Sequence, residues 1–342
     1  MTEKPKAMDL FCGAGGLSEG LRQAGFKVVG AVDLDALACK TYRLNHSGVK
    51  LWESDIRRLS GGAIVRALGI RRGELDLLAA CPPCQGFSRL RTKNGTRRNR
   101  DRRNDLIFEV LRIVRSVKPI SVMLENVPGL TRNKRFCTFR KGLEMLGYRV
   151  VWSVLNTVDF NVPQRRRRLV VLASRLGQPR FARTVSKRST VRQAIACLTP
   201  PRRSRDPLHN YSTLRSERIK ARIIDIPRDG GSRAALGAER QLPCHKRSDG
   251  FRDIYGRMAW DAPSPTITCG CINPSKGRFL HPEANRAITL REAALLQTFP
   301  ATYRFPLDEG RYSVAELIGN ALPPEFIRRH AVALREVTRV TK

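Results

Sequence analysis

Hydrophobic positions follow two alternating patterns along the first half of the chain. Short apolar runs, of which residues 27–33 are rich in β-branched side chains, are followed by stretches in which apolar residues recur at helical spacing. The runs predict strands at residues 6–11, 27–33, 74–80, 120–125, 148–155 and 169–173. Between them, the helical spacing predicts helices at residues 16–24, 34–45 and 105–117. This alternation favours an α/β fold, with a mixed but mostly parallel sheet covered by helices on both faces.

The pattern changes after Ser174. Residues 175–258 are rich in Arg, Pro, Gly and Ser and have weak periodicity, so they predict a smaller, irregular and basic domain. Order returns near Trp260, with helices predicted at 289–297 and 314–318 and a basic amphipathic helix at 324–340. We therefore divide the chain at residues 1–174, 175–258 and 259–342, and we find no internal repeat.

The amino-acid composition indicates that the protein binds a polyanionic partner. Lys and Arg number 64 against 30 Asp and Glu, a formal charge of +34. Solubility requires far less charge, so nucleic acid is the simplest partner. Apart from the segment 324–340 we see no long amphipathic basic helix, and we see no signal peptide or membrane-length apolar run, which argues against a membrane role. An odd number of cysteines, nine, argues for a reducing cytoplasm rather than a disulfide framework.

A glycine turn follows the first predicted strand, in the sequence DLFCGAGGLSEG of residues 9–20. Strand, glycine turn and helix bring backbone N–H groups close to a cofactor in α/β proteins. The dinucleotide spacing is incomplete because Ser18 replaces the third glycine, so a purely structural turn is nearly as good an interpretation. Asp33 ends the second predicted strand, where a carboxylate can accept from ribose hydroxyls, and Asp55 follows an apparent third strand, in the sequence SDI, where a carboxylate can accept from an adenine amine. Each alone reads equally as a solvated acid; together with the turn they indicate an adenosyl pocket.

The sequence ACPPCQGFS, residues 80–88, follows another buried strand and allows three interpretations. Cys81 and Cys84 are spaced like a redox pair. They are also spaced like half of a zinc site, whose other ligands would come from Cys244, His245, Cys269 and Cys271. The third interpretation is a single nucleophilic thiolate at Cys84, with Cys81 as a small buried hydrophobe.

Basic and acidic residues near this loop are of the types that bind phosphates and exchange protons with a nucleic-acid base. The Arg-rich segment 89–104 can close over a phosphate backbone, or it can be a solvated loop. Glu125 ends a strand at the edge that Cys84 occupies, where a carboxyl group can share a proton with a ring nitrogen. In the run QRRRR, strand alternation predicts that Arg166 and Arg168 point together toward a base carbonyl and phosphate, while Gln164 organises the loop. A solvated basic patch is the alternative interpretation of that run.

The order of these motifs resembles the cytosine-5 DNA methyltransferases, of the bacterial and phage type with a single target-recognition region. The matching motifs are DLFCGAGG, the acid at 33, SDI, PPCQGFS, ENVPG, QRRRR, TLREAALLQTFP and GNALPP. The resemblance covers residues 8–174 and 260–324, on either side of a variable region. Two departures are Asp33, where the family usually has Glu, and Leu322, where Val is common.

The resemblance implies a Rossmann-like fold, S-adenosylmethionine as cofactor and no metal. The residues it places at the cofactor are Phe11, Gly13, Gly16, Asp33, Leu34, Asp55, Ile56, Pro83, Leu106 and Asn320. Those it gives to catalysis and the target base are Cys84, Glu125, Asn126, Arg166 and Arg168. The DNA contacts we expect are Gln85, Ser88, Arg89, Arg98, Gln164 and Arg165. Because Asn320 lies near the end of the chain, the C-terminal segment is expected to pack back on the first domain.

The implied reaction flips a cytosine out of duplex DNA and methylates C5 through a covalent bond between Cys84 and C6. Double-stranded DNA is the expected partner, together with a cognate restriction endonuclease if the protein belongs to such a system. We expect a monomer in a prokaryotic cytoplasm, associated with the nucleoid. Three alternatives stay open at this stage: a tRNA-directed methyltransferase, an inactive DNA-binding relative, and the redox interpretation of Cys81 and Cys84.

Overall fold

The structure is a computed structural model and describes residues 3–83, 102–211, 213–237 and 253–339. The chain forms two compact units. The first comprises Met1–Phe160, Arg167–Thr184 and Leu322–Lys342, and the second comprises Asn161–Arg166 and Val185–Ala321. Residues 259–321 therefore belong to the second unit, whereas the C-terminal helix belongs to the first.

A seven-stranded sheet with strand order β3-β2-β1-β4-β5-β7-β6 forms the centre of the first unit. Only β7 runs against its neighbours, pairing antiparallel with both β5 and β6. This confirms the mixed, mostly parallel sheet predicted from the alternating pattern. The strands are β1 (Lys6–Leu10), β2 (Lys27–Asp33), β3 (Lys50–Glu53), β4 (Leu77–Ala80), β5 (Ser121–Asn126), β6 (Arg149–Asn156) and β7 (Arg167–Ser174).

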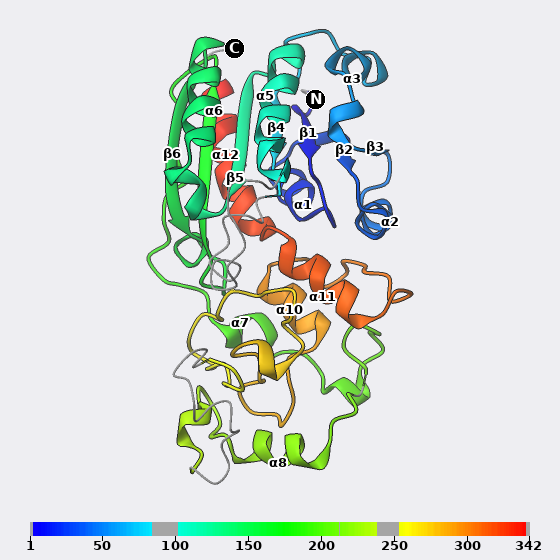
Figure 1. The fold of residues 1–342 in the computed structure, drawn as a ribbon, viewed down its shortest axis with the longest axis vertical. Coiled ribbons are helices and arrows are strands. Elements are labelled where there is room, and N and C mark those ends of the chain that lie inside the picture. The colour runs from blue at the N-terminus through cyan, green and yellow to red at the C-terminus, as the bar shows by residue number, and fades with distance from the viewer. Residues whose placement is uncertain (1–2, 84–101, 212, 238–252, 340–342) are drawn as a thin grey trace. The chain divides into compact units, whose positions relative to one another are not determined.

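Helices cover both faces of this sheet (Figure 1). On one face, α5 (Leu106–Val117) packs beside α3 (Gly61–Ala67) and α6 (Lys134–Met145). Alternate residues of a strand point to opposite faces, and the two side chains of β1 that flank Asp9 join the core under α5. Asp9 itself points the other way and bonds to α1 (Gly16–Gln23), which therefore covers the opposite face.

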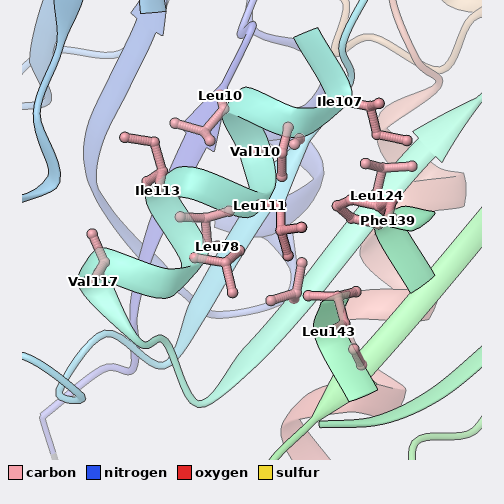
Figure 2. Packing of buried hydrophobic residues seen from close by; sticks show 14 of the residues in the cluster. Leu10, Leu78, Ile107, Val110, Leu111, Ile113, Val117, Leu124, Phe139 and Leu143 are labelled. Carbon is pink, nitrogen blue, oxygen red and sulfur yellow. The ribbon is translucent and has the colours of Figure 1, made fainter. Parts of the chain in front are cut away.

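The apolar stripe of α5 explains why that helix docks on the sheet. Residues Ile107, Val110 and Val117 are spaced at helical intervals and are at most 2% exposed. In Figure 2 they lie over Leu78 and Leu124 of the central strands. Full burial of one such side chain contributes roughly 1.5–3 kcal/mol, so the stripe outweighs any intrinsic helix preference of the segment.

The C-terminal helix α12 (Pro324–Arg339) packs against α1 at very short range. A Cβ atom on Gly20 would lie 2.5 Å from the carbonyl oxygen of Pro324 and 2.6 Å from Cβ of Ile327. Only glycine allows this approach, which fixes the last helix of the chain beside the glycine turn of the first strand.

Two helices of the first unit, α3 and α6, have no counterpart in the sequence-based assignment. In α6 the buried residues are Phe136, Phe139 and Leu143, separated by Arg, Lys and Thr, and this narrow stripe was not recognised. In α3 two glycines begin a helix of only seven residues. Both were missed because short or polar segments depend on tertiary packing more than on their own pattern.

The second unit has almost no regular sheet in its described part, where pairing is limited to isolated bridges. Its helices are α7 (Val191–Ile195), α8 (Glu217–Asp225), α10 (Leu290–Leu296) and α11 (Arg311–Asn320). Fully buried Arg257 connects several segments of this unit. Its guanidinium donates to the carbonyl oxygens of Ile223, Ile226, His281 and Ala284. One buried cation thus satisfies carbonyl groups that irregular backbone leaves without partners.

No helix in the described part of either unit is both long and apolar enough to cross a membrane.

Candidate active site

The carboxyl ends of the parallel strands bring the predicted site residues of the first unit to one edge of the sheet. Glu125 lies near the end of β5, Asp33 ends β2, and the turn after β1 begins at Phe11. Antiparallel β7 starts at the same edge, so its second residue, Arg168, is also there. Ligands of open α/β sheets bind at such edges.

The glycine turn has the backbone conformation that its composition indicated. Gly13 and Gly15 have φ angles of 53° and 93°, and Phe11 has a φ of 62°. Gly15 is the N-cap of α1 and has no side chain to satisfy the first N–H groups of that helix. The turn therefore presents backbone donors and the positive end of a helix dipole.

Asp33 is held by this turn rather than pointing freely outward. Its Oδ2 accepts from the Gly13 N–H at 2.7 Å, and its Oδ1 accepts from the Asp35 N–H at 2.9 Å. Burial raises the pKa of the Asp33 carboxyl, although both backbone hydrogen bonds oppose that shift. Beside it, the side chain of Leu34 is 67% exposed.

A buried chain of polar groups anchors the turn, and the sequence analysis missed its acid. Ser18 Oγ donates to Asp9 Oδ2 at 2.7 Å and lies 2.8 Å from Tyr42 Oη. This explains the serine at the third glycine position, since its hydroxyl donates to one of the two oxygens of the buried Asp9 carboxyl group. Burial raises the pKa of Asp9 to about 7, with the Ser18 hydrogen bond opposing the shift. An acid in the middle of a buried strand was the available signal.

We expect Asp9→Asn to change how the stability of the protein depends on pH. The folded carboxyl, with a pKa of about 7, binds a proton more tightly than an ordinary carboxyl at 3.8. The stabilisation from that proton is complete below pH 4 and disappears as the pH rises through 7. Between pH 5.5 and 8 the wild type should lose about 2 kcal/mol of unfolding free energy that the variant keeps.

Denaturant unfolding of both proteins at the two pH values measures this difference. Buried His46 and His330, each with a pKa lowered to about 4 by burial, act in the opposite direction below pH 6.5. They are present in both proteins and cancel in the comparison. Parallel pH profiles would contradict the shift assigned to Asp9.

The other expected cofactor residues differ in accessibility. Asp55 caps the 3₁₀ helix η1 (Ile56–Arg58) and pairs with Arg57, whose hydrogen bonds lower the pKa of the Asp55 carboxyl. Ile56 and Leu106 are 3% and 8% exposed and belong to the core. Gly16 is buried at the first position of α1, and Pro83 is half-buried after β4. Adenine recognition by Asp55 remains a prediction.

Glu125 is the most strongly constrained acid of the edge. It is 3% exposed, and each oxygen faces a different neighbour. Cys81 Sγ donates to Oε2 at 3.0 Å, and Arg168 Nε lies 2.7 Å from Oε1 at ion-pair distance. A buried carboxyl group needs such partners, and Cys81 and Arg168 supply one for each of its oxygens.

Asn126 connects the ends of β5 and β4. Its Nδ2 donates to the carbonyl oxygen of Pro82 at 3.1 Å, while its Oδ1 accepts from the Val127 N–H at 2.8 Å. The amide thereby fixes the backbone that leads toward the predicted nucleophile. Cys84 itself, and Gln85, Ser88, Arg89 and Arg98, lie outside the described residues.

The remaining expected site residues belong to the second unit. Buried Arg166 donates to the carbonyl oxygens of Ile267 and Gly319, and it precedes β7, so strand alternation does not govern its direction. Gln164 is fully buried and bonds to Gln297 Oε1 and the Ile267 N–H. This agrees with a loop-organising role and leaves its amide remote from solvent. Asn320 is exposed and accepts from the Cys269 thiol.

A hollow of about 400 Å³ lies within the second unit and is lined in part by Arg165, Lys276 and Arg278. Arg278 is already bonded to backbone carbonyls and to Asp253, whereas Arg165 and Lys276 are exposed. Thr266 and Thr268, which the sequence analysis did not single out, add hydroxyl groups to the lining. The hollow contains none of the expected catalytic residues and suits an anionic group.

The zinc interpretation gains no support from the part of the chain that the structure describes. Within that part, no three His, Cys, Asp or Glu side chains are grouped to hold a metal. Cys271 is fully buried, and Cys84, Cys244 and His245 fall outside the described ranges.

Comparison with known proteins shows similarity over nearly the whole chain. The family model of C-5 cytosine-specific DNA methylases matches residues 6–336. Type II methylase M.HgiDII of Herpetosiphon aurantiacus is 36% identical, over 97% of this chain and 98% of its own length. Type II methyltransferase M1.BsuMI of Bacillus subtilis is 33% identical, over 95% of this chain and 79% of its own length.

Solved structures show the same fold at lower identity. A putative DNA modification methyltransferase encoded within an Escherichia coli prophage superposes with a TM-score of 0.77 at 22% identity, covering 98% of this chain and 99% of that one. The DNMT2 protein of Spodoptera frugiperda superposes with a TM-score of 0.67 at 16% identity, covering 97% and 99%. These matches confirm the Rossmann-like architecture.

Proposed function

Because the chain belongs to the C-5 cytosine-specific DNA methylase family, we propose that it methylates C5 of cytosine in double-stranded DNA with S-adenosylmethionine as methyl donor. The observation that carries the proposal is buried Glu125, held between Arg168 and Cys81 at the end of the strand that neighbours the Pro-Cys-Gln loop. Cys81 adjoins Glu125 at the ends of the paired strands β4 and β5, and Cys84 follows Cys81 by three residues in the sequence, so a constrained carboxyl group and the proposed nucleophile belong to the same edge of the sheet.

The first unit fits an adenosyl cofactor. Gly13 and Gly15 leave the turn after β1 free of side chains, Asp33 is fixed at the end of β2, and exposed Leu34 offers an apolar surface beside it. When bound, S-adenosylmethionine supplies a methyl group activated by its sulfonium charge, which the attacked ring takes up at C5. Phe11, Gly16, Asp55, Ile56, Pro83, Leu106 and Asn320 complete the proposed cofactor set.

The protein's own residues make C5 reactive. The Cys84 thiolate adds to C6 and forms an S–C bond, which breaks the conjugation of the ring and gives C5 enamine character. Glu125 in its carboxylic acid form donates its proton to N3 as the thiolate adds, which neutralises the charge that moves there, and the proton returns to Glu125 before the product leaves. After methylation a base removes the C5 proton, the electrons restore the C5–C6 double bond, and Cys84 leaves as thiolate. Because both faces of the ring are needed, the cytosine must leave the helix.

We assign recognition of the base and its backbone to the following residues. Arg168 and Asn126 keep Glu125 and the Pro82 backbone in place, and Arg166 holds the segment that precedes β7. The DNA contacts would come from Gln85, Ser88, Arg89, Arg98 and Arg165, with the hollow beside Arg165 and Lys276 as a phosphate site. Residues 175–258 would read the DNA sequence.

The names of the relatives suggest the setting. Both bacterial relatives compared above are Type II enzymes, so a cognate restriction endonuclease is the partner we propose, acting on the same DNA site in a prokaryotic cytoplasm. Bisulfite sequencing of DNA from cells that express the protein tests the product and reveals the site. Labelled methyl transfer to DNA and to tRNA in parallel separates the two substrates, and methylation of tRNA alone would overturn the proposal.

We expect DNA affinity to fall steeply with salt. With a net charge of +34 the protein should replace counterions at several phosphates when it binds. About four such contacts would weaken binding about 100-fold between 50 and 200 mM salt. Fluorescence anisotropy with a labelled duplex measures the slope, and a flat salt response would contradict binding to the phosphate backbone.

A further inference from the structure

Cys81 lies beside Glu125 because of the pairing of β4 with β5. The two strands are parallel, and Ala80 pairs with Leu124. The residues that follow this pair are Cys81, directly after β4, and Glu125, which is still within β5. The backbone N–H of Cys81 also donates to the carbonyl oxygen of Leu10 at 3.2 Å, which fixes the residue to the end of β1. The position of the thiol is therefore determined by the central strands of the sheet rather than by a loop.

The thiol makes a polar contact that none of the three sequence interpretations of Cys81 requires. Its Sγ is 3.0 Å from Glu125 Oε2, and a thiol beside a carboxylate is the donor of that hydrogen bond. A residue that served only as a small buried hydrophobe would not need this bond. Since Arg168 faces the other oxygen, each of the two oxygens of Glu125 has its own partner, the thiol at Oε2 and the guanidinium at Oε1.

Rotation of the Glu125 side chain is opposed from two directions. Losing the thiol would leave Oε2 without this donor in a side chain that is only 3% exposed. The carboxylate would then turn toward Arg168 or recruit water, and in both cases it would leave the orientation that the sheet imposes. Small errors of orientation at a reacting group reduce turnover more than binding.

We propose that Cys81 is a positioning residue, whose S–H group holds Glu125 Oε2 in the orientation needed for proton sharing with the target base. This inference rests on the proposed function, because it assigns Cys81 a role at the same site. It requires a hydrogen-bond donor at position 81 and no change in the oxidation state of sulfur.

Three substitutions separate the donor from the volume of the side chain. Cys81→Ala removes the donor and leaves space, Cys81→Val removes it and fills the space, and Cys81→Ser keeps a donor in a smaller side chain. We expect kcat for DNA methylation to fall about tenfold in the Ala and Val variants, with KM for DNA and for S-adenosylmethionine within about twofold of wild type. The Ser variant should keep kcat within about threefold of wild type.

Steady-state methyl transfer under reducing conditions gives these values, and thermal denaturation reports whether each variant is folded. Cys137→Ala, an exposed cysteine of α6, is the matched control and should leave kcat unchanged. Wild-type kcat in the Ala and Val variants would overturn the inference while leaving the proposed function intact. Equal losses in all three would also overturn it, since a redox or purely steric role predicts no rescue by serine. A wild-type protein without cytosine methylation would remove both proposals.

Discussion

Replacing Cys84 with alanine should reduce methyl transfer to DNA by about 10⁴-fold or more, while DNA affinity stays within about threefold of wild type. The large effect follows because cytosine C5 becomes nucleophilic only after addition at C6, and alanine offers no atom to add. Binding survives because the many basic groups that contact phosphates are unchanged. Transfer of labelled methyl groups to a duplex, with anisotropy on the same duplex, measures both quantities.

Two comparisons make that result specific to Cys84. Cys137→Ala changes an exposed thiol of the same unit and should be fully active. Cys84→Ser should be nearly as inactive as the alanine variant, since a hydroxyl is a much weaker nucleophile at neutral pH. Full turnover by either Cys84 variant would refute the covalent mechanism and favour a different use of the Pro-Cys-Gln loop.

Substitution of Glu125 by glutamine should lower kcat about 10³-fold, with smaller changes in KM. Glutamine has nearly the same shape but cannot share a proton with N3 as a carboxyl group does. It also leaves the guanidinium of Arg168 beside a neutral group in a site that is nearly closed to solvent. Loss of that pairing should lower the thermal midpoint as well, because one partner of a buried ion pair is then uncompensated.

The contribution of Glu125 to the stability of the fold can be separated from its contribution to the reaction. Glu144→Gln removes an exposed carboxylate that pairs with Arg140 on α6, and it should change neither kcat nor the thermal midpoint appreciably. Glu125→Asp keeps the charge and shortens the reach, so it should retain more stability than the glutamine variant but little of the activity. If Glu125→Gln kept kcat within about threefold of wild type, the proposed role of this acid in proton sharing would be wrong.

The pattern of hydrophobic residues predicted secondary structure correctly in segments whose buried side chains recur at strand or helix spacing. The strands predicted at 27–33 and 120–125 match β2 and β5 within one residue, and the helix predicted at 105–117 matches α5. The strand predicted at 74–80 is shorter, because only Leu77–Ala80 pairs within the sheet. Segments with a weak pattern, such as the one that forms α6, were not recognised.

The partners of polar residues were not available from pattern. Ser18 is nine residues from Asp9, and Cys81 is 44 residues from Glu125, yet each pair is joined by a hydrogen bond. Arg166 and Arg168, which strand alternation placed on one face, engage groups of two different units. Such pairings depend on the order of strands in the sheet and on the residue at which a strand begins. Neither can be read from the identities of the paired residues.

The sequence by itself determined the alternating α/β elements, the glycine turn, the excess of positive charge and the order of motifs that identify the family. These follow from periodicity, backbone freedom and charge, which are local or additive properties. Only the tertiary structure decided that Cys81 donates to Glu125, that Ser18 donates to Asp9 and that Arg257 bonds to several backbone carbonyl groups of the second unit. Each is a contact between distant residues, and burial makes such contacts obligatory only once the surrounding chain has excluded water.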